Sequence, residues 1–135
     1  MPRQLDDSTM VAGQIDPASL PDLAAAGVTM IINNRPDHED PGQPTSAEME
    51  TAAAASGIAY RHVPIARGMG PSDVEAMRCA LRDAAGGTAL AYCRSGGRSV
   101  LAWAVAKSED GVARAELERC AEQAGFSLAP IAHLL

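Results

Sequence analysis

The residues best suited to chemistry in this sequence lie in the stretch CRSGGRS, at positions 93–99. A cysteine stands first, two glycines follow, and four residues separate the cysteine from the second arginine. Gly96 and Gly97 can adopt positive φ angles and so turn successive backbone N–H groups toward one point. Arg98 can bind an oxyanion through two hydrogen bonds. All these groups favour a thiolate, so the pattern predicts that Cys93 is a nucleophile in a small anion site.

The other residues of this stretch have less definite roles. Ser95 and Ser99 can each donate a hydrogen bond to the sulfur, and the sequence does not decide between them. Arg94 either points to solvent or contacts the substrate as it arrives. We therefore predict one loop that binds an anion and consists of Arg94, Ser95, Gly96, Gly97, Arg98 and Ser99.

A second candidate group follows the apolar run VTMIINN. The next ten residues, RPDHEDPGQP, contain three prolines and several charges, so they predict an irregular and mobile loop. Asp37 is the preferred proton donor if the reaction needs one, ahead of Asp40 and Asp73. Arg35 would be a second contact for the anion, and Asn34 would support the site through a hydrogen bond.

These groups have to be positioned by an alternation of strands and helices. Apolar runs predict strands at 10–15, 28–34, 58–65 and 88–93. Helix start signals stand at Asp16–Pro17, Thr45–Glu48, Ser72–Glu75 and Arg98, and further helical segments are expected at 113–124 and 128–134. The pattern is typical of an α/β fold with a mostly parallel sheet of about four strands, flanked by helices.

The run TALAYC, which leads to Cys93, has no polar alternation and predicts a strand in the centre of the sheet. Its carboxyl end carries the cysteine, and open α/β sheets place their ligand sites at that edge. The sequence therefore predicts that the sheet presents Cys93 to substrate.

Composition limits the classes of function. A length of 135 residues suits one domain, 1–135, and a net charge of −6 disfavours nucleic acid. No run is long enough to cross a membrane and the first residues lack a signal sequence, so a cytoplasmic protein is expected. Three cysteines and three histidines without metal-ligand spacing indicate neither a disulfide framework nor a metal site. We expect no cofactor.

The segments QI, INNRPD, PGQP, YRHVPI and AYCRSGGRS, in that order, resemble a bacterial family, the phosphatase-like domain of beta-lactamase hydrolase-like protein, also named sulfur transferase. The resemblance runs from about Gln4 to Leu134. It implies a cysteine-phosphatase-like fold with a short, rhodanese-like C-x4-R loop. It also implies a partner enzyme that metabolises persulfides, because such domains are sometimes fused to a metallo-hydrolase domain of that kind.

The sequence departs from cysteine phosphatases in two ways. Tyr92 precedes the cysteine where those enzymes usually have histidine, and the loop is one residue shorter. A smaller loop is less suited to hold the three equatorial oxygens of a transferring phosphoryl group. Sulfur transfer through a Cys93 persulfide is therefore the preferred hypothesis, with a small sulfur-containing anion or persulfide as substrate.

Two alternatives stay open. One is a nonclassical phosphatase that forms a phosphocysteine at Cys93 and acts on a phosphate ester. The other is a module that binds an anion or persulfide without catalysis and delivers sulfur to a partner protein.

Overall fold

The computed structural model describes residues 2–135. Its centre is a five-stranded sheet in the order β1-β2-β5-β3-β4. The strands are β1 (Arg3–Asp6), β2 (Thr9–Ala12), β3 (Val28–Asn33), β4 (Ala59–His62) and β5 (Thr88–Tyr92). Only the β1–β2 pair is antiparallel, and the three other pairs are parallel. The α/β class with a mostly parallel central sheet is thus confirmed.

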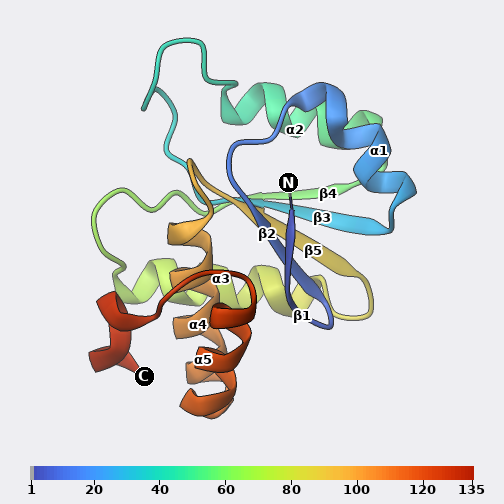
Figure 1. Cartoon of the computed structure of the whole chain (residues 1–135). Helices are drawn as coiled ribbons and strands as arrows, with labels where there is room; N and C mark the ends of the chain where they lie inside the picture. Colours follow the sequence, from blue (N-terminus) through green and yellow to red (C-terminus); the bar gives the residue numbers. More distant parts are fainter. Residues whose placement is uncertain (1) are drawn as a thin grey trace.

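Helices cover both faces of the sheet (Figure 1). One face carries the 3-10 turn η1 (Pro17–Ser19) with α1 (Leu20–Ala25) and α2 (Ser46–Ala55), and the other carries α3 (Pro71–Asp83), α4 (Gly97–Glu109) and α5 (Arg114–Gln123). The chain ends in a second 3-10 segment, η2 (Ala129–Leu134), which contacts α4.

The core is divided by the sheet into two apolar clusters. The larger includes Trp103 and Leu117 from the side of α3, α4 and α5, and the smaller includes Leu20 and Met49 from the side of α1 and α2. Leu90 of β5 is fully buried, as expected for a central strand with both faces covered. The strand that leads to Cys93 therefore has a rigid, dry support.

The first strand differs from the prediction. The sequence RQLD at β1 does not predict a strand, because Leu5 is its only apolar residue and no apolar alternation marks it. It is a strand because a tight turn returns the chain onto β2, and the Asp6 carboxylate accepts the backbone N–H of Ser8 at 3.0 Å. The sheet accordingly has one more strand than the four predicted, and β2 ends earlier, at Ala12.

The start of α3 also differs from the prediction. The helix start signal at Ser72–Glu75 is wrong, since the N-cap is Gly70 and not Ser72, and the helix therefore begins two residues earlier, at Pro71. Proline suits the first helical position, where no N–H partner is required. The carboxylate of Asp73 accepts the N–H of Gly70 at 2.9 Å, so the Asp73 side chain caps the first turn of α3. By contrast, the capping box of Thr45 and Glu48 is confirmed at the start of α2.

The topology brings the carboxyl ends of β2, β3 and β5 to one edge of the sheet. β5 lies between β2 and β3, so the residues after these three strands are neighbours in space. This edge, where a parallel sheet leaves a crevice, holds the groups that the sequence singled out.

Candidate active site

Residues 93–99, here the cysteine loop, run directly from β5 into α4. The backbone N–H of Gly96 donates to the Sγ of Cys93 at 3.1 Å. Gly96 has a φ of +97°, which a residue with a side chain rarely adopts. Gly97 is the first residue of α4, so the positive end of this helix also faces the loop. Gly96 therefore turns its N–H toward the sulfur as predicted, whereas Gly97 has no positive φ and instead begins the helix.

The pKa of Cys93 is lowered from the ordinary thiol value. Burial by itself would raise this pKa, but hydrogen bonds from the backbone N–H groups of Ser99, Ser95 and Gly96 outweigh burial. The hydroxyl of Ser99 adds a smaller effect in the same direction. This hydroxyl is buried, and its oxygen has no hydrogen-bond partner in residues 2–135. The cysteine loop thus stabilises a thiolate with donors that the backbone fixes.

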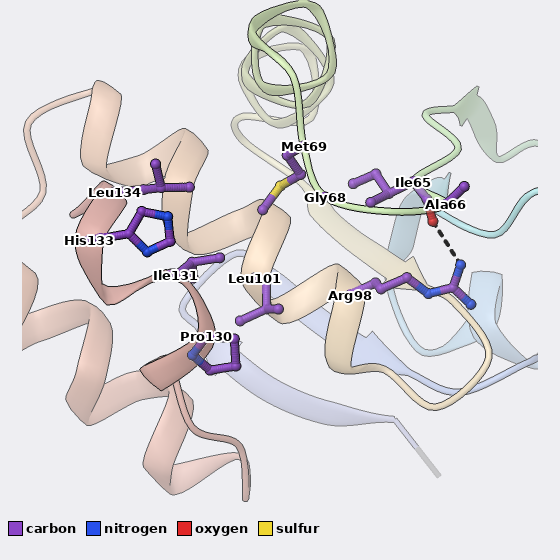
Figure 2. A pocket seen from close by; sticks show the side chains of 10 residues that line it. All are labelled: Ile65, Ala66, Gly68, Met69, Arg98, Leu101, Pro130, Ile131, His133 and Leu134. Atoms are coloured by element: carbon purple, nitrogen blue, oxygen red, sulfur yellow. Dashed lines mark hydrogen bonds between the residues drawn. The ribbon is translucent and has the colours of Figure 1, made fainter.

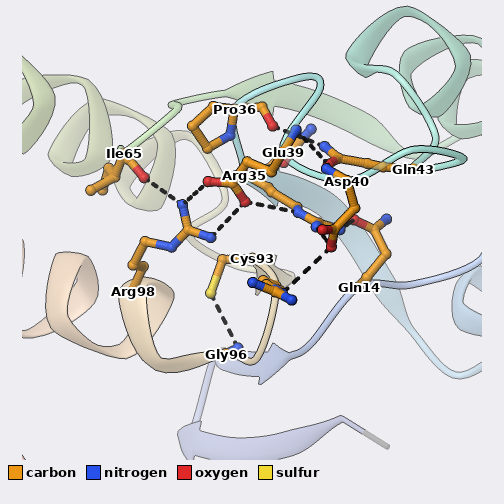
Figure 3. Close-up of polar contacts among 12 residues, drawn as sticks. Gln14, Arg35, Pro36, Glu39, Asp40, Gln43, Ile65, Cys93, Gly96 and Arg98 are labelled. Atoms are coloured by element: carbon orange, nitrogen blue, oxygen red, sulfur yellow. Dashed lines mark hydrogen bonds and ion pairs between the residues drawn. The ribbon is translucent and has the colours of Figure 1, made fainter. Parts of the chain in front are cut away.

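Arg98 stands beside this thiol but is engaged elsewhere. Its Nη1 and Nη2 donate to the two carboxylate oxygens of Glu39 at 2.7 and 2.8 Å, and Nη1 also donates to the carbonyl of Ile65 at 2.7 Å. The hydrogen bond to Glu39, the largest effect, and the nearby Cys93 both raise the pKa of Arg98. The guanidinium group is therefore fixed between a carboxylate and the sulfur (Figure 3).

Arg35, which follows the end of β3, contacts the same carboxylate of Glu39. Its Nε donates to Glu39 at 2.9 Å, its Nη1 to Gln14 at 2.9 Å and its Nη2 to Asp40 at 2.6 Å. Only 3% of Arg35 is exposed, which is unusual for an arginine and requires such a full set of partners. Two arginines thus share the carboxylate of Glu39, whose pKa they lower to about 2, with the Arg98 hydrogen bond as the main cause.

Residues 35–44, here the acidic loop, are irregular, as predicted. Gln43 fastens the loop through its side chain. The amide oxygen accepts the N–H groups of Glu39 and Asp40 at 3.1 and 3.2 Å, and the amide nitrogen donates to the carbonyl of Pro36 at 2.8 Å. These bonds hold the acidic side chains toward the cysteine loop (Figure 3).

Asn34 lies beneath the site rather than in it. Its backbone N–H donates to the carbonyl of Tyr92 at 2.8 Å, and its side chain donates to the carbonyl of Val63 at 3.0 Å. The buried side-chain oxygen of Asn34 has no partner in residues 2–135. Asn34 therefore joins the ends of β3 and β5, which is the supporting position that the sequence suggested.

Asp37 is placed away from the arginines of the site. Its carboxylate accepts the backbone N–H of Ser46, the first residue of α2, at 2.8 Å. Within residues 2–135 no hydrogen bond joins Asp37 to the cysteine loop. Asp37 thus ties the acidic loop to α2, and the part of proton donor stays a prediction.

Arg94 lies at the rim, with two thirds of its side chain exposed. Its Nε is 3.5 Å from the carboxylate of Asp40, so Arg94 connects the cysteine loop to the acidic loop. Of the two roles considered for Arg94, the structure places it mostly in solvent.

Sequence reasoning missed two residues of the site, Gln14 and Glu39. Gln14 follows β2, its N–H donates to the carbonyl of Arg94 at 3.3 Å, and its side chain accepts from Arg35. The strand predicted at 10–15 includes Gln14, and only the earlier end of β2, at Ala12, places Gln14 at the edge where parallel strand ends gather. Glu39 gave no signal in the sequence, since its partner Arg98 lies 59 residues away.

A cavity of about 440 Å³ opens beside Arg98 (Figure 2). Apolar side chains from the segment after β4, from α4 and from η2 line most of it, including Met69, Leu101 and Ile131. The bond from Arg98 to the carbonyl of Ile65 crosses its edge. The charged end of the site therefore borders an apolar hollow.

Two further features are absent from residues 2–135. No helix there is long and apolar enough to cross a membrane. Over the same range, no three histidine, cysteine, aspartate or glutamate side chains form a group that could hold a metal ion.

Known proteins with similar sequence and structure carry the same fold. A protein of Agrobacterium fabrum called beta-lactamase hydrolase-like protein is 32% identical over 130 residues, which is 93% of this chain and 29% of that protein. The chain thus spans less than a third of this relative. The solved structure of nma1982 from Neisseria meningitidis, a candidate phosphatase, is 31% identical, covers 98% of this chain and 96% of its own, and has a TM-score of 0.81.

Tk-PTP in its active form shares the fold alone, at 18% identity and a TM-score of 0.66 over 94% of this chain and 86% of its own. The sequence profile of the phosphatase-like domain of beta-lactamase hydrolase-like protein matches residues 2–110. The fold is therefore phosphatase-like, and the chain belongs to the family of that phosphatase-like domain.

Proposed function

We propose that this chain is a cysteine-dependent sulfurtransferase that carries sulfur as a persulfide on Cys93 and works as one domain over residues 1–135. The observation that carries the proposal is the cysteine loop, which combines a thiol of lowered pKa with only four residues before Arg98. A lowered pKa increases the fraction of Cys93 that is thiolate, the form that acts as a nucleophile. The small loop suits a sulfur atom better than a phosphoryl group with three equatorial oxygens.

The first step uses an anionic donor such as thiosulfate. The Cys93 thiolate attacks the outer, sulfane sulfur, a new S–S bond forms, and the S–S bond of thiosulfate breaks. The electron pair of the broken bond leaves with sulfite. The total charge is −3 before the step, from the thiolate and thiosulfate, and −3 after it, from the persulfide anion and the sulfite dianion. The N–H groups of Gly96 and its neighbours stabilise the persulfide anion where they held the thiolate.

The second step regenerates the free thiolate of Cys93. An acceptor thiolate attacks the outer sulfur of the persulfide, and the Cys93 thiolate leaves with the electrons of the S–S bond. Cyanide reacts in the same way and leaves as thiocyanate. Both leaving groups, sulfite and the Cys93 thiolate, are stable anions, so neither step needs a proton donor.

The carboxylates beside the site support this chemistry over phosphoryl transfer. A phosphatase protonates its leaving alcohol, and the donor has to keep a proton near neutral pH. Glu39 has a pKa of about 2, and Asp40 is bound to Arg35. Asp37 donates no hydrogen bond toward Cys93 in residues 2–135 and instead accepts the N–H of Ser46.

A phosphatase is the second candidate, because one observation favours it. The Neisseria meningitidis structure that matches almost the whole chain is that of a candidate phosphatase. In that reaction Cys93 would form a phosphocysteine, and Asp37 would have to turn from Ser46 toward the leaving oxygen.

Paired assays separate the two candidates. We expect the reduced protein to convert thiosulfate and cyanide to thiocyanate, and we expect the Cys93→Ser variant to have no activity above background. The control is Cys79→Ser, since Cys79 lies on α3 outside the site.

Hydrolysis of an aryl phosphate that vanadate blocks, together with no thiocyanate production, would overturn the assignment in favour of a phosphatase. A third result, sulfur loading without release to thiols or cyanide, would contradict the enzyme and favour a carrier module.

A further inference from the structure

The structure shows an anion already bound between the two arginines of the site, and this anion belongs to the chain itself. One carboxylate oxygen of Glu39 accepts from Arg35 at 2.9 Å and from Arg98 at 2.8 Å, and the other accepts from Arg98 at 2.7 Å. Three N–H donors from two guanidinium groups thus converge on a group with two oxygens. The same geometry fits any small oxyanion with at least two oxygens.

The arginines are built to keep this position whether or not Glu39 remains there. Arg35 is buried and also bound by Gln14 and Asp40, and Arg98 is also bound by the carbonyl of Ile65. Each guanidinium group therefore keeps a partner outside the acidic loop if the Glu39 carboxylate leaves, Gln14 for Arg35 and the carbonyl of Ile65 for Arg98. The Glu39 carboxylate, by contrast, has no hydrogen-bond partner in residues 2–135 besides these two arginines, and a quarter of its side chain is exposed.

The burial of Cys93 also indicates that Glu39 has to move before a donor can react. Cys93 has no solvent exposure, so a donor cannot reach its sulfur without a movement of the groups around it. The Glu39 carboxylate and both arginines lie beside the cysteine in Figure 3. Movement of Glu39 from the arginines would vacate a positive pocket next to the sulfur, with no change in the cysteine loop.

We propose that Arg35 and Arg98 form the binding site for the oxyanion group of the sulfur donor, and that Glu39 occupies this site until a donor displaces it. The substrate class is then a sulfane-sulfur donor with a sulfonate-type end, such as thiosulfate or an organic thiosulfonate. The naming of the donor rests on the proposed function, whereas the two-arginine site and its internal occupant do not.

The contact between Glu39 and the two arginines responds to competing anions and not to pH near neutrality. Glu39 has a pKa of about 2, so its carboxylate remains charged throughout the neutral and mildly acidic range. A competing anion is therefore needed to free the arginines. An occupied site weakens the apparent affinity for a ligand by the fraction of molecules in which the site is free.

Sulfate tests the proposal, because it has the right oxygens and no sulfur to transfer. The measurement is the concentration of sulfate that protects Cys93 from iodoacetamide, in the full chain, in Glu39→Gln and in Arg35→Met. We expect Glu39→Gln to bind sulfate about tenfold more tightly than the native chain, since the internal competitor loses its charge. We expect Arg35→Met to bind it about tenfold more weakly, because one of two charged contacts is lost.

Glu50→Gln is the matched control, since Glu50 is exposed on α2 and the change in net charge is the same. It should leave sulfate protection unchanged. Equal or weaker protection in Glu39→Gln than in the native chain would overturn the proposal, because Glu39 would then orient the arginines rather than compete for them. If Glu39→Gln does not fold, Glu39→Asp keeps the charge but shortens the reach, and tighter sulfate binding is expected there as well.

The result also separates this inference from the proposed function. Tight sulfate binding by Glu39→Gln without transfer from thiosulfate would keep the anion site and reject the sulfurtransferase. Transfer from thiosulfate with no change in sulfate protection would keep the sulfurtransferase and reject the anion site.

Discussion

The two loops that meet at the candidate active site are held in different ways. In the cysteine loop, backbone N–H groups of Ser95, Gly96 and Ser99 act on the sulfur, and the start of α4 fixes them. In the acidic loop, contacts to the site run through the side chains of Glu39 and Asp40. The cysteine loop is therefore a backbone cradle, a ring of N–H groups around the sulfur. The acidic loop contacts the site through charged side chains that other anions can replace.

This difference suggests a division of labour. A backbone cradle keeps its shape when the charge inside it changes from thiolate to persulfide, because the donors cost no reorganisation. Side-chain ion pairs can be replaced by ligand anions, since guanidinium groups bind carboxylate and sulfonate oxygens alike. The cysteine loop therefore sets reactivity, while the acidic loop sets which anions reach it.

The strongest disruption of the cysteine loop is Gly96→Ala. Its φ of +97° strains any side chain, and an added Cβ would lie 3.1 Å from the ring of Phe126 and 3.4 Å from the carbonyl oxygen of Ala12. We expect the transfer rate to fall by about 100-fold or more, because the Gly96 N–H moves away from the sulfur. Thiocyanate production measures the rate.

The control for this change is Gly111→Ala. Gly111 has a φ of +91° but nothing within 4 Å of an added Cβ, so it carries the same backbone strain far from the sulfur. It should cost stability and leave the rate per folded molecule unchanged. If both variants keep the native rate, the backbone cradle is not the source of reactivity.

A smaller loss is expected from Arg98→Lys. A lysine keeps the charge but cannot bridge both oxygens of Glu39 and the carbonyl of Ile65. We expect transfer from thiosulfate to fall by about 10- to 100-fold, with Arg114→Lys on α5 as the control. Native activity in Arg98→Lys would show that charge alone suffices and that the forked geometry is not used.

A moderate effect on stability is expected from Gln43→Ala, which removes three hydrogen bonds inside the acidic loop. The free energy of unfolding in urea should fall by about 1–2 kcal/mol, because such bonds contribute modestly each and the loop borders solvent. The exposed Gln123→Ala on α5 should change it little. Because the acidic loop holds Glu39 against Arg98, loosening it should not lower the reactivity of Cys93, and a loss of reactivity would mean that the acidic loop supports the cysteine loop.

The smallest effect concerns acid stability. Glu39 has a pKa of about 2 in the folded chain against an ordinary 4.5, so its ion pairs stabilise the fold above about pH 4.5. That contribution is lost as the pH falls from about 4.5 toward 2. The difference in unfolding free energy between the native chain and Glu39→Gln should shrink over this interval. A difference that is constant with pH would show that the pKa of Glu39 is not lowered.

The same contrast explains what could be predicted from the sequence. Central placement of TALAYC, the glycine pair and the start of α4 follow from local patterns, and the structure has each of them. The β1 strand was missed because its pairing with β2, and not its own residues, makes it a strand. The pairing of Glu39 with Arg98 was missed for a similar reason, since a charge does not specify a partner 59 residues away.

The central claim is that Cys93 is a thiolate that takes up one sulfur atom. The most direct measurement is the intact mass of the reduced protein before and after thiosulfate, with the modified residue located by peptide mapping. The account predicts a gain of one sulfur atom on Cys93, its removal by a thiol, and no gain in Cys93→Ser. An unchanged mass, or a sulfur atom located on Cys79 or Cys120, would contradict it.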